Sequence, residues 1–178
     1  MAMPEITAKR IMVYGTTGSG KSTLAARISK ATGLPYHAID DLTWLPGWVE
    51  VSEERQREIM TELVAGDEWV IDSGYAKWLD LVLPRVELIV GLDYPPPIIF
   101  FRLVRRTLGR VMTRKPICNG NRESFLMMLS KNSILLWFFK SYKRKRARMR
   151  QMFVELPCEL VCFSKPREAN DWLRNLLS

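Results

Sequence analysis

The stretch Gly15-Thr16-Thr17-Gly18-Ser19-Gly20-Lys21-Ser22 decides the fold, because it matches the phosphate-binding pattern G-x-x-x-x-G-K-[ST] at every fixed position. The residues around it have the character that this pattern requires. Ile11-Met12-Val13-Tyr14 is a short apolar run that predicts a buried strand, and Leu24 and Ile28 follow the loop at helical spacing. A strand, a glycine-rich loop and a helix in this order predict a site for the phosphates of a nucleoside triphosphate.

Each residue type in the loop has a physical role. Glycines let the backbone turn tightly, so that several N–H groups point inward, and the helix that follows adds the partial positive charge of its N-terminus. Lys21 reaches the β- and γ-phosphates, and the Ser22 hydroxyl is a ligand for Mg²⁺. We therefore expect ATP and Mg²⁺ as cofactors. The nucleotide-binding residues expected here are Gly15, Thr16, Thr17, Gly18, Ser19, Gly20, Lys21, Ser22 and Thr23.

The length and the cysteines limit the class of protein. A chain of 178 residues is long enough for one domain with a sizeable core, so we expect a single domain over residues 1–178. Its three cysteines form neither a zinc pattern nor an even disulfide framework. The first apolar run belongs to the strand before the loop rather than to a signal peptide, and no stretch is long enough to span a bilayer. These features predict a cytoplasmic protein.

The net charge of +8 is concentrated in one segment. Residues 124–154 contain eight basic residues and no acidic one, so the rest of the chain holds 19 of the 27 basic residues against 19 acidic ones. Two interpretations remain open. Lys140–Arg150 is a candidate surface for weak contact with nucleic acid or anionic lipid, or it is a solvated helix face near a polyphosphate site. The oligomeric state is not predicted by any pattern in the chain.

Carboxylates follow three predicted strands. Asp40 comes after Tyr36–Ile39, Asp72 after Trp69–Ile71 and Asp93 after Leu88–Leu92. Parallel strands bring such residues to one sheet edge, where ligands bind in open α/β sheets. A carboxylate there binds Mg²⁺ through water or orients an acceptor hydroxyl. For Asp40, a loop acid that caps the next turn is an equally good interpretation.

Two segments flank this edge. Trp44–Trp48 predicts a rigid aromatic loop that either closes over an acceptor or packs against the core, and a helix follows from Ser52, giving an acceptor-side region over about 40–66. Residues 112–123 read as a short, mobile, basic lid. Between them, a helix after Tyr94–Pro97 places Arg102 and Arg106 on one face. Because that face begins beside the phosphate-binding edge, we expect both arginines to contact the ligand.

Strands that alternate with helices after a phosphate loop predict a three-layer α/β fold with a parallel sheet. The chain also resembles the adenylate-kinase-like P-loop kinases, and most of all a small bacterial group called topology-modulation proteins. Beyond the loop, the residues that carry the resemblance are Ile39–Trp44, Trp69–Tyr75, Leu92–Pro95 and Asn119–Ser124. The resemblance implies five strands in the order 2-3-1-4-5.

The resemblance also implies residue roles. Asp72 matches the acid that helps to hold Mg²⁺ through water, and Asp93 matches the acid of the motif after the fourth strand. Arg102 matches an arginine that stacks on adenine, and Arg106 one that contacts phosphate. The lid arginine corresponds to Arg122, with Arg114 the second choice. The Phe-Pro-Arg that grips the acceptor nucleotide in adenylate kinases is replaced by Ser73-Gly74-Tyr75-Ala76, which leaves the acceptor open.

Together these patterns predict an ATP- and Mg²⁺-dependent phosphotransferase that moves the γ-phosphate to a nucleotide, a nucleoside or another small hydroxyl compound. The alternatives are a nucleotide-dependent nucleic-acid-binding regulator and a plain NTPase. The expected catalytic residues are Lys21, Asp40, Asp72, Arg106 and Arg122, and the expected metal-binding residues are Ser22, Asp72 and Asp93. We expect the basic segment Lys140–Arg150 to be secondary to the chemistry.

Overall fold

Five parallel strands form the central sheet in the computed structural model, which describes residues 6–114, 116–124, 126 and 133–175. The strands are β1 (Arg10–Gly15), β2 (Tyr36–His37), β5 (Trp69–Ser73), β6 (Leu88–Leu92) and β7 (Glu159–Phe163). Their order is β2-β5-β1-β6-β7, and every neighbouring pair is parallel. Counted in chain order within this sheet, this is the expected order 2-3-1-4-5. The labels run higher because β3 and β4 form a separate hairpin.

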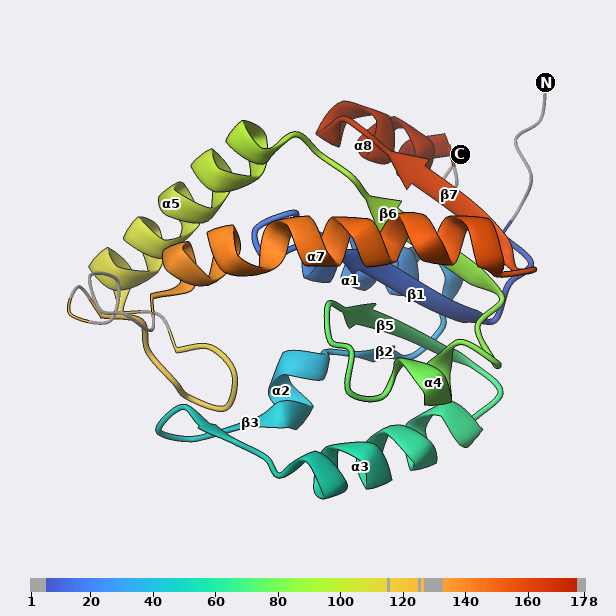
Figure 1. The fold of residues 1–178 in the computed structure, drawn as a ribbon, viewed down its shortest axis with the longest axis horizontal. Helices are drawn as coiled ribbons and strands as arrows, with labels where there is room; N and C mark the ends of the chain where they lie inside the picture. The colour runs from blue at the N-terminus through green and yellow to red at the C-terminus, as the bar shows by residue number, and fades with distance from the viewer. Residues whose placement is uncertain (1–5, 115, 125, 127–132, 176–178) are drawn as a thin grey trace.

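Helices cover both faces of the sheet, as expected (Figure 1). They are α1 (Lys21–Thr32), α2 (Ile39–Thr43), α3 (Glu53–Ala65), α4 (Leu79–Val82), α5 (Pro96–Thr113), α7 (Ile134–Glu155) and α8 (Pro166–Asn175). Successive residues of β1 point to opposite faces, as the pleat of a strand requires. Ile11 and Val13 join the apolar cluster that includes α1 and α8, while Met12 and Tyr14 join the cluster that includes α3 and α4.

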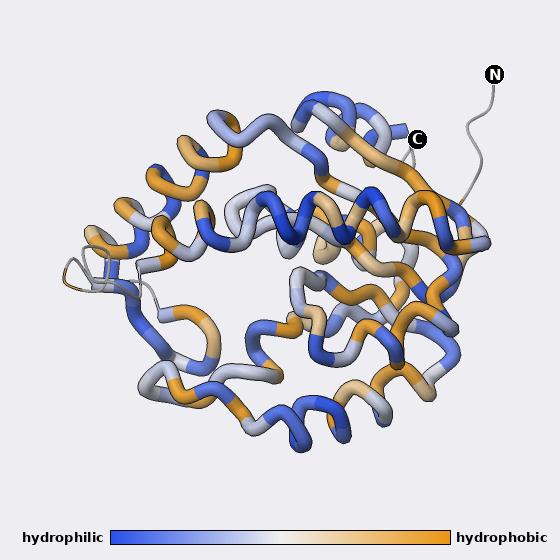
Figure 2. The backbone as a smooth tube through the Cα atoms, viewed as in Figure 1, coloured by the Kyte–Doolittle hydropathy of each residue, from blue (hydrophilic) through white to orange (hydrophobic). Residues whose placement is uncertain are grey.

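The long helix α7 takes part in both apolar clusters. Near its start, Phe138 and Tyr142 pack in the first cluster, together with residues of α5. Near its end, Met149 and Met152 pack in the second cluster. Figure 2 shows that the middle of this helix is hydrophilic, and apolar side chains near its two ends, such as Phe139 and Val154, are exposed. No helix in the described part of the chain is long and apolar enough to cross a membrane.

The acceptor-side region differs from expectation in two details. Trp44–Trp48 is not a plain loop, because β3 (Trp44–Leu45) pairs antiparallel with β4 (Val49–Glu50). The second sheet strand ends at His37 rather than Ile39, and Asp40 lies in the first turn of α2. The reason is one contact at the start of α2: Asp72 Oδ1 accepts a hydrogen bond from the Ile39 N–H at 3.2 Å. A carboxylate at that place satisfies a free donor of the helix N-terminus.

The segment after the lid is described only in part. A long helix was expected from Phe125, with a break near Ser130–Ser133, but residues 125 and 127–132 lie outside the described residues. The described helix α7 begins at Ile134, where Ser133 Oγ accepts a hydrogen bond from the Leu135 N–H at 3.2 Å. Ser133 is therefore the N-cap of α7.

Candidate active site

The phosphate loop has the conformation that its glycines predict. Gly18 and Gly20 have φ angles of 82° and 95°, a left-handed backbone that costs little only for glycine. The loop leads directly into α1, and the first turn of α1 contains no acidic residue. Two hydroxyls of the loop, Thr16 Oγ1 and Ser19 Oγ, are buried without a hydrogen-bond partner among the described residues. Unpaired buried donors beside a positive helix end form a site that favours an anion.

Ser22 and Asp72 meet at the mouth of the loop, as expected. The hydroxyl of Ser22, in the first turn of α1, donates a hydrogen bond to Asp72 Oδ2 near the end of β5. Burial raises the pKa of Asp72 above the ordinary range of a carboxyl group, and the nearby Lys21 ammonium opposes this rise. A hydroxyl and a carboxylate side by side are the hard oxygen donors that suit Mg²⁺.

Asp40 is held by side chains that the sequence did not point to. The Tyr75 hydroxyl donates to Asp40 Oδ1 at 2.8 Å, and Trp44 Nε1 donates to the Tyr75 oxygen at 3.1 Å. The Tyr36 hydroxyl lies nearby. Burial raises the pKa of Tyr36, and the Asp72 carboxylate raises it further. Asp40 and Asp72 are therefore neighbours with different partners. Asp40 is bound by Tyr75, and Asp72 is bound by Ser22.

Arg102 and Arg106 both project from α5 but reach different places. Arg102 lies against the loop, since a Cβ added to Gly20 would come within 2.7 Å of its Nη2. Its guanidinium carbon is 5.9 Å from the centre of the Tyr94 ring. Arg106 lies one turn further on, toward Asp40 and Cys118. Burial, reinforced by the neighbouring Arg110, lowers the pKa of Arg106, whose Nε is buried without a hydrogen-bond partner among the described residues.

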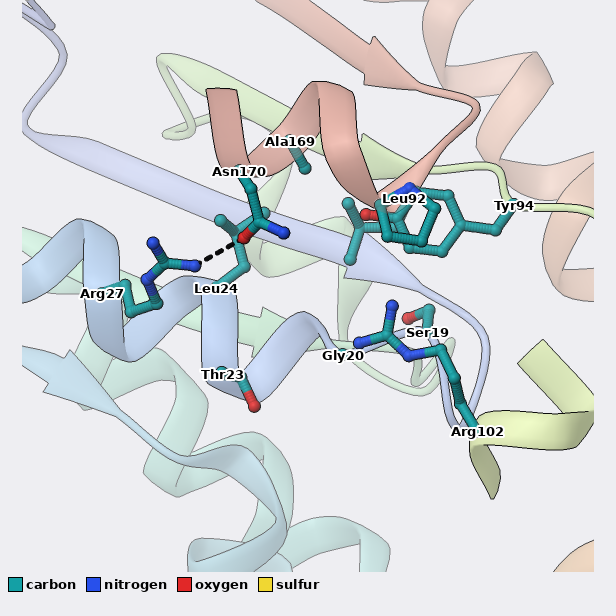
Figure 3. Close-up of a pocket in the computed structure, with 11 residues that line it drawn as sticks. Ser19, Gly20, Thr23, Leu24, Arg27, Leu92, Tyr94, Arg102, Ala169 and Asn170 are labelled. Carbon is teal, nitrogen blue, oxygen red and sulfur yellow. Dashed lines mark hydrogen bonds between the residues drawn. The ribbon is translucent and has the colours of Figure 1, made fainter. Parts of the chain in front are cut away.

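A pocket opens beside Arg102, between the phosphate loop and α8 (Figure 3). One wall is Arg102 and Tyr94, and the opposite wall is the start of α8, where Asn170 Oδ1 accepts a hydrogen bond from Arg27 Nη1 at 2.6 Å. The residues that line it are Ser19, Gly20, Thr23, Leu24, Arg27, Leu92, Tyr94, Arg102, Pro166, Ala169 and Asn170. The pocket therefore adjoins the loop on the side away from Asp40.

The expected metal role of Asp93 finds no support in the geometry. Its carboxylate forms an ion pair with Arg146 of α7, with Nε–Oδ1 at 2.5 Å and Nη2–Oδ2 at 3.1 Å. Arg150 adds a contact at 3.5 Å. Asp93 is thus engaged by two arginines of the basic segment, and the oxygen pair beside Lys21 is Ser22 and Asp72. Among the described residues, no three acidic, histidine or cysteine side chains cluster as a metal site.

The described part of the lid is fastened to the β3–β4 hairpin. Asn119 Nδ2 donates to the carbonyls of Asp41 and Trp44 at 2.7 and 2.8 Å. Asn121 is buried, and its side chain donates to the Leu45 carbonyl at 2.9 Å and accepts from the Trp48 N–H at 2.8 Å. We call these contacts the lid–hairpin latch. Arg122 is exposed, and its carbonyl accepts from Trp48 Nε1 at 3.2 Å, so the catalytic role of its side chain stays a prediction.

Comparisons with known proteins agree with this fold. The family model described as "ATPase family associated with various cellular activities (AAA)" matches residues 11–71, from β1 to Ile71 in β5. No curated protein matches the chain. The phosphate loop and the five-stranded parallel sheet between helices define a P-loop NTPase fold.

Among solved structures, small kinases are similar to the chain over nearly its whole length. A gluconokinase from Sinorhizobium meliloti 1021 has a TM-score of 0.55 and 18% identity, over 94% of this chain and 89% of its own. A shikimate kinase from Bacteroides thetaiotaomicron has a TM-score of 0.56 and 13% identity, over 96% and 97%. A shikimate kinase from Acinetobacter baumannii in complex with shikimate has a TM-score of 0.57 and 15% identity, over 96% and 92%. At these identities the likeness shows the fold.

Proposed function

We propose that the protein is an ATP- and Mg²⁺-dependent kinase that transfers the γ-phosphoryl group to the hydroxyl of a small acceptor. The observation that carries the proposal is the pair of neighbouring carboxylates with different partners. Asp72 is bound to Ser22 of the phosphate loop, and Asp40 is bound to Tyr75 on the acceptor side. Hydrolysis of ATP requires no acceptor pocket, whereas transfer requires a second group that orients the acceptor.

The donor side follows from the loop and the pocket beside it. Lys21 and the backbone N–H groups of the loop bind the phosphates, and the base of the nucleotide occupies the pocket between Arg102 and α8. A planar guanidinium over this pocket suits an aromatic base. The place of Arg102 beside this pocket supports the base-stacking role that the resemblance implies for it.

Mg²⁺ fits the residues at the mouth of the loop. The Ser22 hydroxyl would bind the ion directly, and Asp72 would hold it through water. When bound, Mg²⁺ neutralises phosphate charge as it develops during transfer. The Ser22 hydroxyl, which now donates to Asp72, would turn its lone pairs toward the ion.

The chain's own groups account for the transfer step. The acceptor oxygen attacks the γ-phosphorus while the bond to the β–γ bridging oxygen breaks, and its electron pair leaves on ADP. Asp40 accepts the proton of the acceptor hydroxyl, and Tyr75 fixes the carboxylate by its 2.8 Å hydrogen bond. Lys21 and Arg106 stabilise the negative charge of the phosphoryl oxygens.

The test is a transfer screen from γ-labelled ATP to sugars, hydroxy acids, nucleosides and nucleotides. We expect one class to become labelled. Lys21→Ala should slow transfer roughly 10³-fold, as losing one phosphoryl-stabilising cation does. The matched control is Lys30→Ala, at the exposed end of the same helix, which should behave as wild type. Asp40→Asn should abolish labelling of the acceptor while ATP binding persists. If labelled inorganic phosphate is the sole product with every acceptor, the protein is a plain NTPase and the proposal is wrong.

The nucleic-acid alternative is not favoured. Of the seven basic residues in Lys140–Arg150, Lys145, Arg146 and Arg148 are half-buried, and Arg146 is paired with Asp93. The exposed set is Lys140, Lys143, Arg144 and Arg150, of which Arg150 also contacts Asp93. The resemblance to adenylate-kinase-like and topology-modulation proteins rests on the sequence motifs alone. The kinase proposal does not depend on it.

A further inference from the structure

Lys145 occupies a place in α7 that apolar residues otherwise hold. Phe138, Tyr142, Met149 and Met152 are the apolar residues of the buried stripe of the helix, spaced four, seven and three residues apart. Lys145 falls on the same stripe, three residues after Tyr142 and four before Met149. It is therefore a charged, half-buried residue on the face that packs against the sheet. The spacing would have revealed this from the sequence, but the surrounding run of basic residues concealed it.

The Lys145 ammonium lies at the C-terminal edge of the sheet, beside the phosphate loop. A Cβ built on Gly74 would come within 2.9 Å of Lys145 Nζ and 3.2 Å of the Gly15 carbonyl oxygen. Gly74 follows β5, and Gly15 is the first residue of the loop. Because Gly74 has no side chain, the Lys145 ammonium can occupy this space. The ammonium enters the site from α7, whereas Lys21 enters it from α1.

The charges around Lys145 favour a polyanionic ligand. The charged groups that act on it most are the cations Lys21, Arg144 and Arg148 and the anion Asp40. Within the described residues, no ion pair joins Lys145 or Lys21 to a carboxylate. Burial, followed by the repulsion from Lys21, lowers the pKa of Lys145 to about 8. Two lysine ammonium groups that point into one space repel each other when the site is empty. Phosphate oxygens that lie between them stabilise both charges.

We propose that Lys145 is a second catalytic lysine, whose ammonium binds the phosphoryl group in transfer between the phosphate loop and the Gly74 turn. This inference rests on the proposed kinase function. The transfer step keeps its balance: the acceptor oxygen bonds to the γ-phosphorus, ADP leaves with the electron pair, and the acceptor proton goes to Asp40. Lys145 gives up no proton and contributes charge to the oxygens of the moving group.

The test compares two nucleotides that differ at the γ-position, Mg²⁺–ADP and the Mg²⁺ complex of the β,γ-imido analogue of ATP. Lys145→Met should weaken binding of the analogue roughly 10- to 100-fold, the usual loss for a hydrogen bond to a charged group. Binding of ADP should stay close to wild type. The matched control is Lys143→Met, two residues away on the exposed side of the same helix, which should bind both nucleotides normally.

A thermal melt of each variant separates a catalytic role from a structural one. Methionine continues the apolar stripe and removes a buried charge, so Lys145→Met should fold and melt at or above the temperature of the wild type. Lys145→Gln is the second variant and should show the same selective loss. Three outcomes would overturn the inference about Lys145 but not the kinase proposal. The first is equal binding of the analogue by wild type and both variants, and the second is an equal loss for both nucleotides. The third is that both variants fail to fold. A wild-type protein that bound neither nucleotide would overturn the kinase proposal with it.

Discussion

Asp72 near the end of β5 and Asp93 just after β6 lie at the ends of the two strands that flank β1, and they have different surroundings. Asp72 accepts hydrogen bonds from Ser22 and from the Ile39 N–H and sits beside Lys21. Asp93 is held by Arg146 and Arg150. In sequence both are carboxylates at the end of an apolar strand, and only the packing of α7 tells them apart. The first fits a metal site, and the second fastens α7 to the sheet.

The two residues should therefore respond differently to the same substitution. Asp72→Asn should raise the Mg²⁺ concentration required for nucleotide binding by about tenfold, because ligands held through a metal's outer shell change affinity by that order. Asp93→Asn should leave the Mg²⁺ requirement unchanged but lower stability by about 1–2 kcal/mol, since it removes one partner of a half-buried ion pair.

Mg²⁺ titrations of nucleotide binding and chemical unfolding measure the two effects. Asp41→Asn, an exposed carboxylate beside Asp40, is the control and should change neither quantity. If Asp93→Asn has the larger effect on the Mg²⁺ requirement, the metal site belongs at β6 rather than β5.

At the scale of the elements, the lid and the hairpin are joined rather than independent. The latch pairs side-chain amides of residues 119 and 121 with backbone groups of residues 41–48. Cys118, Asn119 and Gly120 all have positive φ angles, which turns the chain so that both amides face the hairpin. Asn is among the residues that best tolerate that conformation. The sequence predicted a lid here, but the partner of the lid depends on contacts across more than 70 residues.

Asn121→Ala should release the lid from the hairpin. The substitution leaves the Leu45 and Cys118 carbonyls and the Trp48 N–H without their buried partner, at a cost of roughly 2–3 kcal/mol. Limited proteolysis should then show new cleavage within residues 41–48 and 116–124. Asn119→Ala, whose amide is exposed, should have a smaller effect. An Asn121→Ala protein as resistant as the wild type would exclude the latch as a restraint.

The helices and strands were predictable to different degrees. β1, β5 and β6 are buried apolar runs, so their positions follow from composition alone. The β3–β4 hairpin was missed because each strand has only two residues and its turn needs a positive φ at Trp48 as well as at Gly47. That the basic segment is secondary to the chemistry stays a prediction, and the proposal for Lys145 departs from it. The sequence did not single out Lys145, because a run of charges does not show which residue lies on the buried stripe.

For the whole molecule, burial of Lys145 makes the free energy of unfolding depend on pH. Its pKa falls from 10.5 to about 8 on folding, so between these values the unfolded chain binds more protons than the folded one. Stability therefore rises with pH across this window, and below pH 8 the cost of the buried charge is fully present. The charges that face the group are Lys21, Arg144, Arg148 and Asp40.

Chemical denaturation at several pH values between 8 and 10.5 measures this dependence. Lys145→Met should give a flatter profile than the wild type, and its advantage should be largest at pH 8 and should shrink toward pH 10.5. Tyrosines and cysteines titrate in the same range, but they are common to both proteins and cancel in the difference. Parallel profiles would mean that Lys145 is not buried in its charged form.

The place of α7 in both apolar clusters has a consequence for the synthesis of the chain. Phe138 and Tyr142 belong to one cluster, and Met149 and Met152 belong to the other, on the opposite face of the sheet. Neither face is fully covered until these residues have been made. At 5–20 residues per second, the ribosome needs about 3–12 s to proceed from the end of β6 at Leu92 to Met152. Throughout that interval the nascent chain carries exposed apolar surface on both faces, and such surface makes a folding chain prone to aggregate.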